Sequence, residues 1–192
     1  MKVLLVLADP SDEARLRLLQ EKRVLEETLR ASRLRDSFDI RDLPSCRLGD
    51  LQDGVGQYKP TVLHFSGHGS EDGLCFENDR GLAQVADPQL LANFLSLAAR
   101  NGLKGVILNA CYSSLQAPVL ADAVGSVIAM EGSATDAGCI GFTRAFYSAL
   151  GEGRRFEIAY EWGLHGGAFM TSAAAARPVL IRARTSVGMT PT

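Results

Sequence analysis

Short apolar runs of strand length alternate with longer segments of helical character along nearly the whole chain, which limits the folds it can adopt. The first run, at 2–8, ends at Asp9-Pro10 and is typical of a strand buried on both faces of a parallel sheet. Further strands are expected at 38–43, 61–66, 106–109 and 127–130, with an edge strand at 178–183. Helices are expected at 47–57, 87–100, 115–123, 136–150 and 156–165. The pattern predicts an α/β domain with a mostly parallel sheet of about five to six strands and helices on both faces.

A long amphipathic helix is expected directly after the first strand. Ser11 is a plausible N-cap, and Asp12 and Glu13 fall in the first turn, where acidic side chains are favourable. Between 11 and 36 the segment carries seven basic and six acidic residues, which we interpret as a solvated face. Four leucines can supply the apolar stripe, namely Leu16, Leu19, Leu25 and Leu29.

The 192 residues fit a single domain at 1–184 and a tail at 185–192, which we expect to be flexible. One insertion interrupts the alternation of strands and helices. Short segments at 73–77 and 82–85, separated by Asn78-Asp79-Arg80-Gly81, predict a surface hairpin after the third strand.

The charge balance bears on the partners of the chain. Twenty lysines and arginines against 22 aspartates and glutamates give a formal net charge of −2, so there is no basic field to hold nucleic acid or an anionic membrane. No stretch approaches the roughly 18 apolar residues of a membrane span. The apolar start at 1–7 meets Asp9, Asp12 and Glu13 instead of the small residues of a leader cleavage site. We therefore expect a cytoplasmic protein with neither nucleic acid nor membrane as a partner.

The sequence contains no pattern typical of a metal or cofactor site. Its cysteines lack a C-x-x-C pair, which favours reduced thiols over disulfides or a zinc finger. His64 and His68 are four residues apart, but His64 lies within an apolar run, where a core or supporting role is expected. The glycines around His68 depart from the dinucleotide fingerprint, and no G-x-x-x-x-G-K-[ST] loop is present. We expect neither a metal ion nor a cofactor.

A histidine and a cysteine follow two consecutive predicted strands. His68 comes after 61–66 and Cys111 after 106–109, and ligands bind outside the carboxyl ends of parallel strands. If the strands are neighbours, the imidazole can take the thiol proton, and the thiolate can attack a carbonyl. The backbone N–H groups of Gly69 and Cys111 are candidates to bind the resulting oxyanion.

Each of these residues also has a structural interpretation. A lone cysteine after a strand is often a small buried hydrophobe, and a lone histidine between glycines is often a turn residue. Their joint placement at successive strand ends favours catalysis.

Several segments together resemble the CHAT proteases, a caspase-like family related to separase. The resemblance rests on VLHFSGHG at 62–69 and VILNACYS at 106–113. It continues through VIAMEG at 127–132 and FTRAFYSAL at 142–150, and the opening ADPS at 8–11 also agrees. The resemblance implies a caspase-haemoglobinase fold and peptide-bond hydrolysis by a dyad of His68 and Cys111, with Gly69 as an oxyanion donor.

The sequence departs from the caspase pattern around the cysteine. Asn109 stands where caspases have Gln and metacaspases an acidic residue, so neither type of specificity can be transferred. Separase-like members use an Asp after the fifth strand to bind a basic P1 residue, and Asp136, with Glu131 nearby, is the corresponding candidate. Ordinary helix capping by Thr135 or Asp136 is the alternative interpretation.

The resemblance implies a cysteine endopeptidase that cuts a protein substrate, of the type found among bacterial defence or cell-death effectors. A separate regulatory or activating protein is a further expected partner. The alternative is a catalytically silent or latent caspase-like interaction module that needs a partner. Both dyad positions are filled, which favours the endopeptidase.

Overall fold

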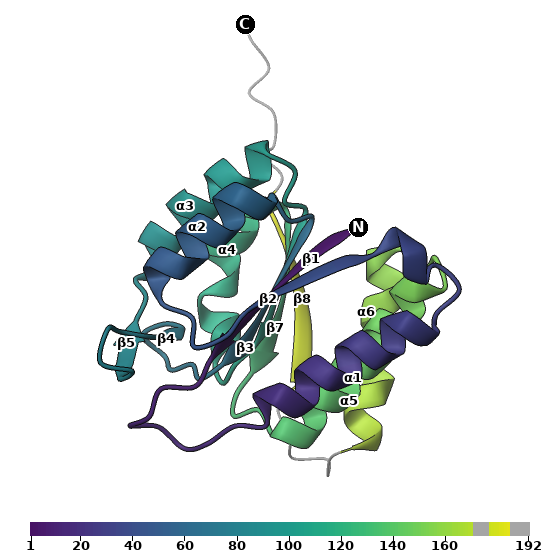
Figure 1. Cartoon of the computed structure of the whole chain (residues 1–192), viewed down its shortest axis with the longest axis horizontal. Helices are drawn as coiled ribbons and strands as arrows, with labels where there is room; N and C mark the ends of the chain where they lie inside the picture. Colours follow the sequence, from purple (N-terminus) through teal and green to yellow (C-terminus); the bar gives the residue numbers. More distant parts are fainter. Residues whose placement is uncertain (171–176, 185–192) are drawn as a thin grey trace, which may run out of the picture.

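A six-stranded sheet forms the centre of the computed structural model, which describes residues 1–170 and 177–184 (Figure 1). The strand order is β2-β1-β3-β6-β7-β8, and every neighbouring pair is parallel except β7 with β8. This confirms the predicted fold class and the edge position of the last strand. The strands are β1 (Lys2–Ala8), β2 (Asp39–Leu43), β3 (Val62–Gly67), β6 (Gly105–Asn109), β7 (Ser126–Glu131) and β8 (Arg177–Arg182).

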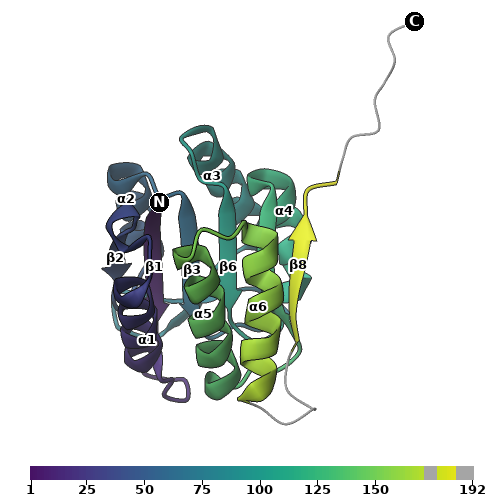
Figure 2. The same cartoon turned by 90° about the vertical axis from the view of Figure 1, so that its right-hand side faces the viewer.

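Helices cover both faces of the sheet. On one face lie α2 (Leu48–Tyr58), α3 (Pro88–Arg100) and α4 (Ala117–Val124). On the other lie α1 (Leu18–Ala31), α5 (Asp136–Gly151) and α6 (Phe156–Phe169), which stand in front of the sheet in Figure 2. Alternate side chains of β1 join opposite cores: Leu4 and Val6 face one, and Val3 and Leu5 face the other. Burial on both faces explains why this strand is a continuous apolar run.

The predicted surface hairpin is present. Its strands β4 (Cys75–Glu77) and β5 (Ala83–Val85) pair antiparallel outside the central sheet. Residues 73–85 are called the hairpin below. Two short 3-10 helices, η1 (Arg35–Ser37) and η2 (Ser113–Leu115), complete the described elements.

The expected start of the first long helix is wrong. Helix α1 begins at Leu18 rather than after Ser11, and residues 9–17, called the strap below, are irregular. The polar side chains that suggested a cap bond elsewhere: Ser11 donates to Gly81 O, and Asp12 accepts from the Ala83 N–H. These tertiary hydrogen bonds replace the local capping bonds on which the prediction rested.

The expected apolar stripe is only partly correct. Leu25 and Leu29 are buried, and Leu16 packs partly against the same core. Leu19 is 76% exposed, whereas Glu21 is only 3% exposed and therefore does not belong to the solvated face expected for the charges of this segment. The expected tail at 185–192 lies outside the described residues.

Candidate active site

A pocket of about 40 Å³ opens at the carboxyl ends of β3 and β6, between the first turns of α1 and α5. His68 and Cys111 both line it, because β3 and β6 are adjacent parallel strands and the two residues follow their ends. These ends point toward the lower side of Figure 2. The structure thus brings together the two residues that the sequence singled out.

The turn after β6 fixes Cys111. Tyr112 has a left-handed backbone (φ 55°), which turns the chain sharply from the strand into η2. Such a conformation in a residue other than glycine is costly and recurs at functional sites. The buried Ser113 hydroxyl donates to Leu108 O (3.1 Å) and accepts from the Met130 N–H (2.9 Å). The nucleophile candidate therefore stands on a turn that is tied to two buried strands.

The Cys111 sulfur is half-buried under the segment between β7 and α5. The Ala134 N–H donates to Sγ at 3.3 Å, and the Ser133 hydroxyl lies 3.9 Å away. Both contacts come from the residues that precede α5. The same contacts also cover part of the sulfur.

His68 is held by the strap. Its Nε2 lies 2.7 Å from Ala14 O, and a carbonyl can only accept, so Nε2 carries the hydrogen. In the neutral ring, Nδ1 is then the unprotonated nitrogen and can accept a proton. The hydrogen bond thus selects the tautomer that a general base requires.

Gly69 lies against the backbone of Cys111. A Cβ built at Gly69 would stand 2.5 Å from Cys111 O, so a larger residue would force the two loops apart. In the described part of the chain, the backbone N–H groups of Gly69 and Cys111 have no hydrogen-bond acceptor. Cys111 lines the pocket and Gly69 directly follows His68, which also lines it, so these two free N–H groups are candidates to bind an oxyanion.

The two acidic candidates occupy different places. Asp136 lines the pocket, and its carboxylate has no hydrogen bond or ion pair within the described ranges. Thr135 caps α5 by accepting the Gly138 N–H, so the cap does not require Asp136. Glu131 is exposed at the end of β7, opposite Arg177 of β8, and does not line the pocket.

A buried carboxylate that the sequence patterns did not reveal also lines the pocket. Glu21 of α1 accepts hydrogen bonds from Ser66 on β3 (2.5 Å) and from Asn109 on β6 (2.5 Å). It also accepts from Thr143 of α5 (2.7 Å) and contacts His64 Nε2 (3.1 Å). Ser66 stands two residues before His68 and Asn109 two residues before Cys111, so one carboxylate joins the starts of the two loops that carry the candidate residues.

The charge of Glu21 is compensated locally. Burial alone raises the pKa of its carboxyl group, but the hydrogen bond and attraction of His64, with the bonds from Ser66 and Thr143, lower the net pKa. His64 Nδ1 in turn meets the Tyr147 hydroxyl at 3.0 Å, so His64 has the supporting role expected for it. One feature of the sequence indicates that Glu21 is buried. Its spacing from Leu18 and Leu25 places it on the buried face of α1.

The other three thiols are buried and unsuited to attack. Burial raises the pKa of Cys46 to about 12, and it raises the pKa values of Cys75 and Cys139 as well. Cys111 is the one cysteine with a half-exposed side chain. Among residues 1–170 and 177–184, no group of three or more His, Cys, Asp or Glu side chains could hold a metal ion. Over the same residues, no helix has the length and apolar character to cross a bilayer.

Known proteins with the same architecture are caspase-like. Caspase-1 from Spodoptera frugiperda superposes with a TM-score of 0.61 over 96% of this chain and 86% of its own, at 13% sequence identity. A secreted C11 cysteine protease from Bacteroides thetaiotaomicron, solved with an irreversible peptide inhibitor, has a TM-score of 0.50 at 10% identity over 83% of this chain and 56% of its own. The fold is therefore caspase-like, and identities this low extend no further than the fold.

Sequence comparison adds one relative. A protein of Gillisia limnaea described as a probable protease is 27% identical over 171 residues, which is 86% of this chain. The chain spans 29% of the length of that relative. No family model matches the chain.

Proposed function

We propose that this chain is a cysteine endopeptidase of the caspase-like type, with His68 and Cys111 as its catalytic dyad and 1–184 as its catalytic domain. The observation that supports it best is the shared pocket, in which the His68 tautomer is set by Ala14 O and Cys111 Sγ receives the Ala134 N–H. The caspase-like neighbours and the probable protease of Gillisia limnaea agree with this proposal. The motifs around His68 and Cys111 support placing it with the CHAT proteases.

The proposed reaction has two stages, acylation of Cys111 and hydrolysis of the resulting thioester. His68 Nδ1 takes the Cys111 thiol proton, and the sulfur attacks the scissile carbonyl carbon. The Gly69 and Cys111 N–H groups bind the oxyanion until the C–N bond breaks, when His68 returns the proton to the leaving amine. Water then gives a proton to His68 as it attacks the thioester, and the acid product and the thiol are released.

We propose that Asp136 favours a basic P1 residue. Its carboxylate lines the pocket beside the dyad and lacks a partner among the described residues. A lysine or arginine side chain would supply the missing cation. Glu131 lies outside the pocket lining and would act only through the field of its charge.

A second candidate function rests on the cover over the sulfur. Ser133 and Ala134 contact Cys111 Sγ on the side of the β7–α5 segment, with Ala134 O at 3.7 Å. A latent module, opened by a separate activating protein, would contain this contact. A bacterial defence or cell-death role, with a protein substrate and such a regulator, follows from the family resemblance.

The test is covalent capture by peptide chloromethyl ketones that differ only in P1. A lysyl reagent is expected to label Cys111 faster than a leucyl one, and His68→Ala should slow labelling by about 100-fold or more. His165→Ala is the matched control, because this exposed histidine lies on α6, outside the pocket lining. Absence of labelling in the folded wild-type chain would contradict the active form and favour the latent module.

A further inference from the structure

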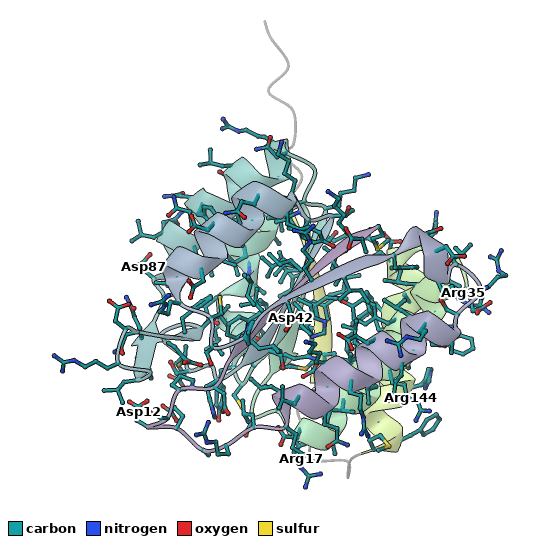
Figure 3. The ribbon with its side chains drawn as sticks, viewed as in Figure 1. Asp12, Arg17, Arg35, Asp42, Asp87 and Arg144 are labelled. Atoms are coloured by element: carbon teal, nitrogen blue, oxygen red, sulfur yellow. The ribbon has the colours of Figure 1, made fainter. Side chains whose placement is uncertain are left out.

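We propose that Asp12, on the exposed strap, is a positioning residue that orients the His68 imidazole through the hairpin. The inference rests on the proposed dyad, since it concerns how the base is aligned. Figure 3 labels Asp12 on the strap, below the hairpin strands, and Arg17 at the start of α1.

The carbonyl that holds His68 belongs to a segment without regular structure. Ala14 lies in the strap, which is neither helix nor strand. Within the strap, Asp9 accepts the Leu16 N–H (3.3 Å) and the Arg15 guanidinium (3.0 Å). These bonds shape the strap but do not fix it to the rest of the molecule.

The anchors of the strap lie on the hairpin. Asp12 Oδ1 accepts the Ala83 N–H at 2.8 Å, and Ser11 donates to Gly81 O through both its N–H (2.8 Å) and its hydroxyl (3.0 Å). Nearer the sheet, the Asp9 N–H donates to the buried Glu77 carboxylate at 3.2 Å. Among these anchors, Asp12 is the one two residues from Ala14, so it controls the position of the carbonyl most directly.

The hairpin also holds the backbone of the same histidine. The Cys75 N–H of β4 donates to His68 O at 3.0 Å. The connections therefore form a closed ring. From His68 O it runs through Cys75 and the paired strands β4 and β5 to Ala83. The bond from Ala83 to Asp12 then leads along the strap to Ala14 O, which returns it to His68 Nε2. The ring restrains the imidazole relative to its own main chain, and loss of the Asp12 link would let Ala14 O shift and widen the range of χ1 and χ2 open to His68.

The Ala83 N–H is available for this bond because of the hairpin register. Ala83 is opposite Glu77, and the bond from the Asn78 N–H to Leu82 O makes that a pair without mutual hydrogen bonds. The Ala83 N–H therefore points outward, and Asp12 is its acceptor. Removing either partner deletes the link of this ring that is nearest to Ala14, while the two bonds from Ser11 to Gly81 and the ladder between β4 and β5 stay in place.

The test compares Asp12→Ala with Asp12→Asn, because the asparagine carbonyl can still accept the Ala83 N–H. Asp53→Ala is the matched control, since Asp53 is exposed on α2, across the sheet from α1 and α5. Alkylation of Cys111 by iodoacetamide is followed by peptide mass spectrometry at about pH 6.5, where imidazole can act as a base, and at about pH 9.5, where thiols ionise unaided. The melting temperature of every variant is measured alongside.

Asp12→Ala is expected to slow alkylation about tenfold at the lower pH, within the effect known for small misplacements of catalytic groups. At the higher pH its rate should equal that of the wild type, and Asp12→Asn should match the wild type at both. Ala83→Pro removes the same hydrogen bond from the donor side and should reproduce Asp12→Ala.

Equal wild-type and Asp12→Ala rates at the lower pH would overturn the proposal. So would an equal loss in Asp12→Asn, or a loss at both pH values that follows the melting temperature. If His68→Ala alkylates at the same low-pH rate as the wild type, the dyad itself is overturned. The two failures are therefore distinguishable.

Discussion

The two halves of the candidate dyad are held by different kinds of structure. Cys111 stands on a turn joined to buried strands through Ser113, which is fully buried. The His68 ring is held from the surface, by a strap carbonyl whose anchors are largely exposed. The candidate nucleophile is therefore positioned by the core, whereas the candidate base is, as proposed above, aligned by exposed contacts that contribute little to stability.

Removing the buried carboxylate should have the largest effect, because it acts on both halves. Glu21→Ala removes the acceptor of the buried Ser66 and Thr143 hydroxyls and one of the two oxygen acceptors of the Asn109 amide, whose other acceptor is the Thr143 hydroxyl. We expect the free energy of unfolding to fall by about 3–5 kcal/mol, with loss of Cys111 labelling, as measured by urea denaturation and peptide capture. A stable and active Glu21→Ala variant would contradict the claim that this network supports both loops.

Because of the same carboxylate, the free energy of unfolding should decrease as the solution becomes acidic. Its folded pKa lies below the ordinary value of 4.5, so its contribution is complete above that value and is lost as the pH falls below it. Urea denaturation across this range should show the difference between wild type and Glu21→Gln narrowing as the solution becomes more acidic. A difference that stays constant with pH would show that the ionised form is not the stabilising one.

Gly69→Ala perturbs the half-buried loop that carries His68. The new Cβ would stand 2.5 Å from Cys111 O, so the loop that carries His68 must move away and take the Gly69 N–H, a proposed oxyanion donor, with it. Turnover of a peptide substrate should fall by about 100-fold, the scale of losing one such donor. Because the loop is only half-buried, the melting temperature should change much less than in Glu21→Ala. An equal fall in stability would break the distinction between the two halves.

The smallest expected effect concerns selectivity. Asp136→Ala should reduce the preference for lysine over leucine at P1 about tenfold, while the rate with the leucyl reagent stays close to the wild type. Glu131→Ala is the control, since its side chain lies outside the pocket lining. An unchanged preference would contradict a role of Asp136 in P1 selectivity.

The sequence predicted most of the fold because the strands are buried on both faces. Periodicity located β1 and β3, and topology then accounts for His68 and Cys111, which follow adjacent parallel strands and line one pocket. Thr135 as the cap of α5 also follows from local residue preferences. These features depend on short-range patterns that a single sequence contains.

The missed features depend on contacts between distant segments. Ser11 and Asp12 have the residue types of a helix start, yet their partners are in the hairpin about 70 residues away in sequence. Glu21 looks like one more surface charge until β3, β6 and α5 supply its donors. No local pattern identifies such partners, although the helical spacing of Glu21 gave a partial indication.

The most direct test of the central claim is the alkylation rate of each cysteine as a function of pH, in wild type and in His68→Ala. Burial raises the pKa values of Cys46, Cys75 and Cys139, so these thiols should stay unreactive up to at least about pH 9. We expect Cys111 alone to react rapidly near pH 6.5 and His68→Ala to abolish this reaction, with the other cysteines unchanged. Slow reaction of Cys111 at that pH, or a fast reaction that survives His68→Ala, would contradict an assembled dyad.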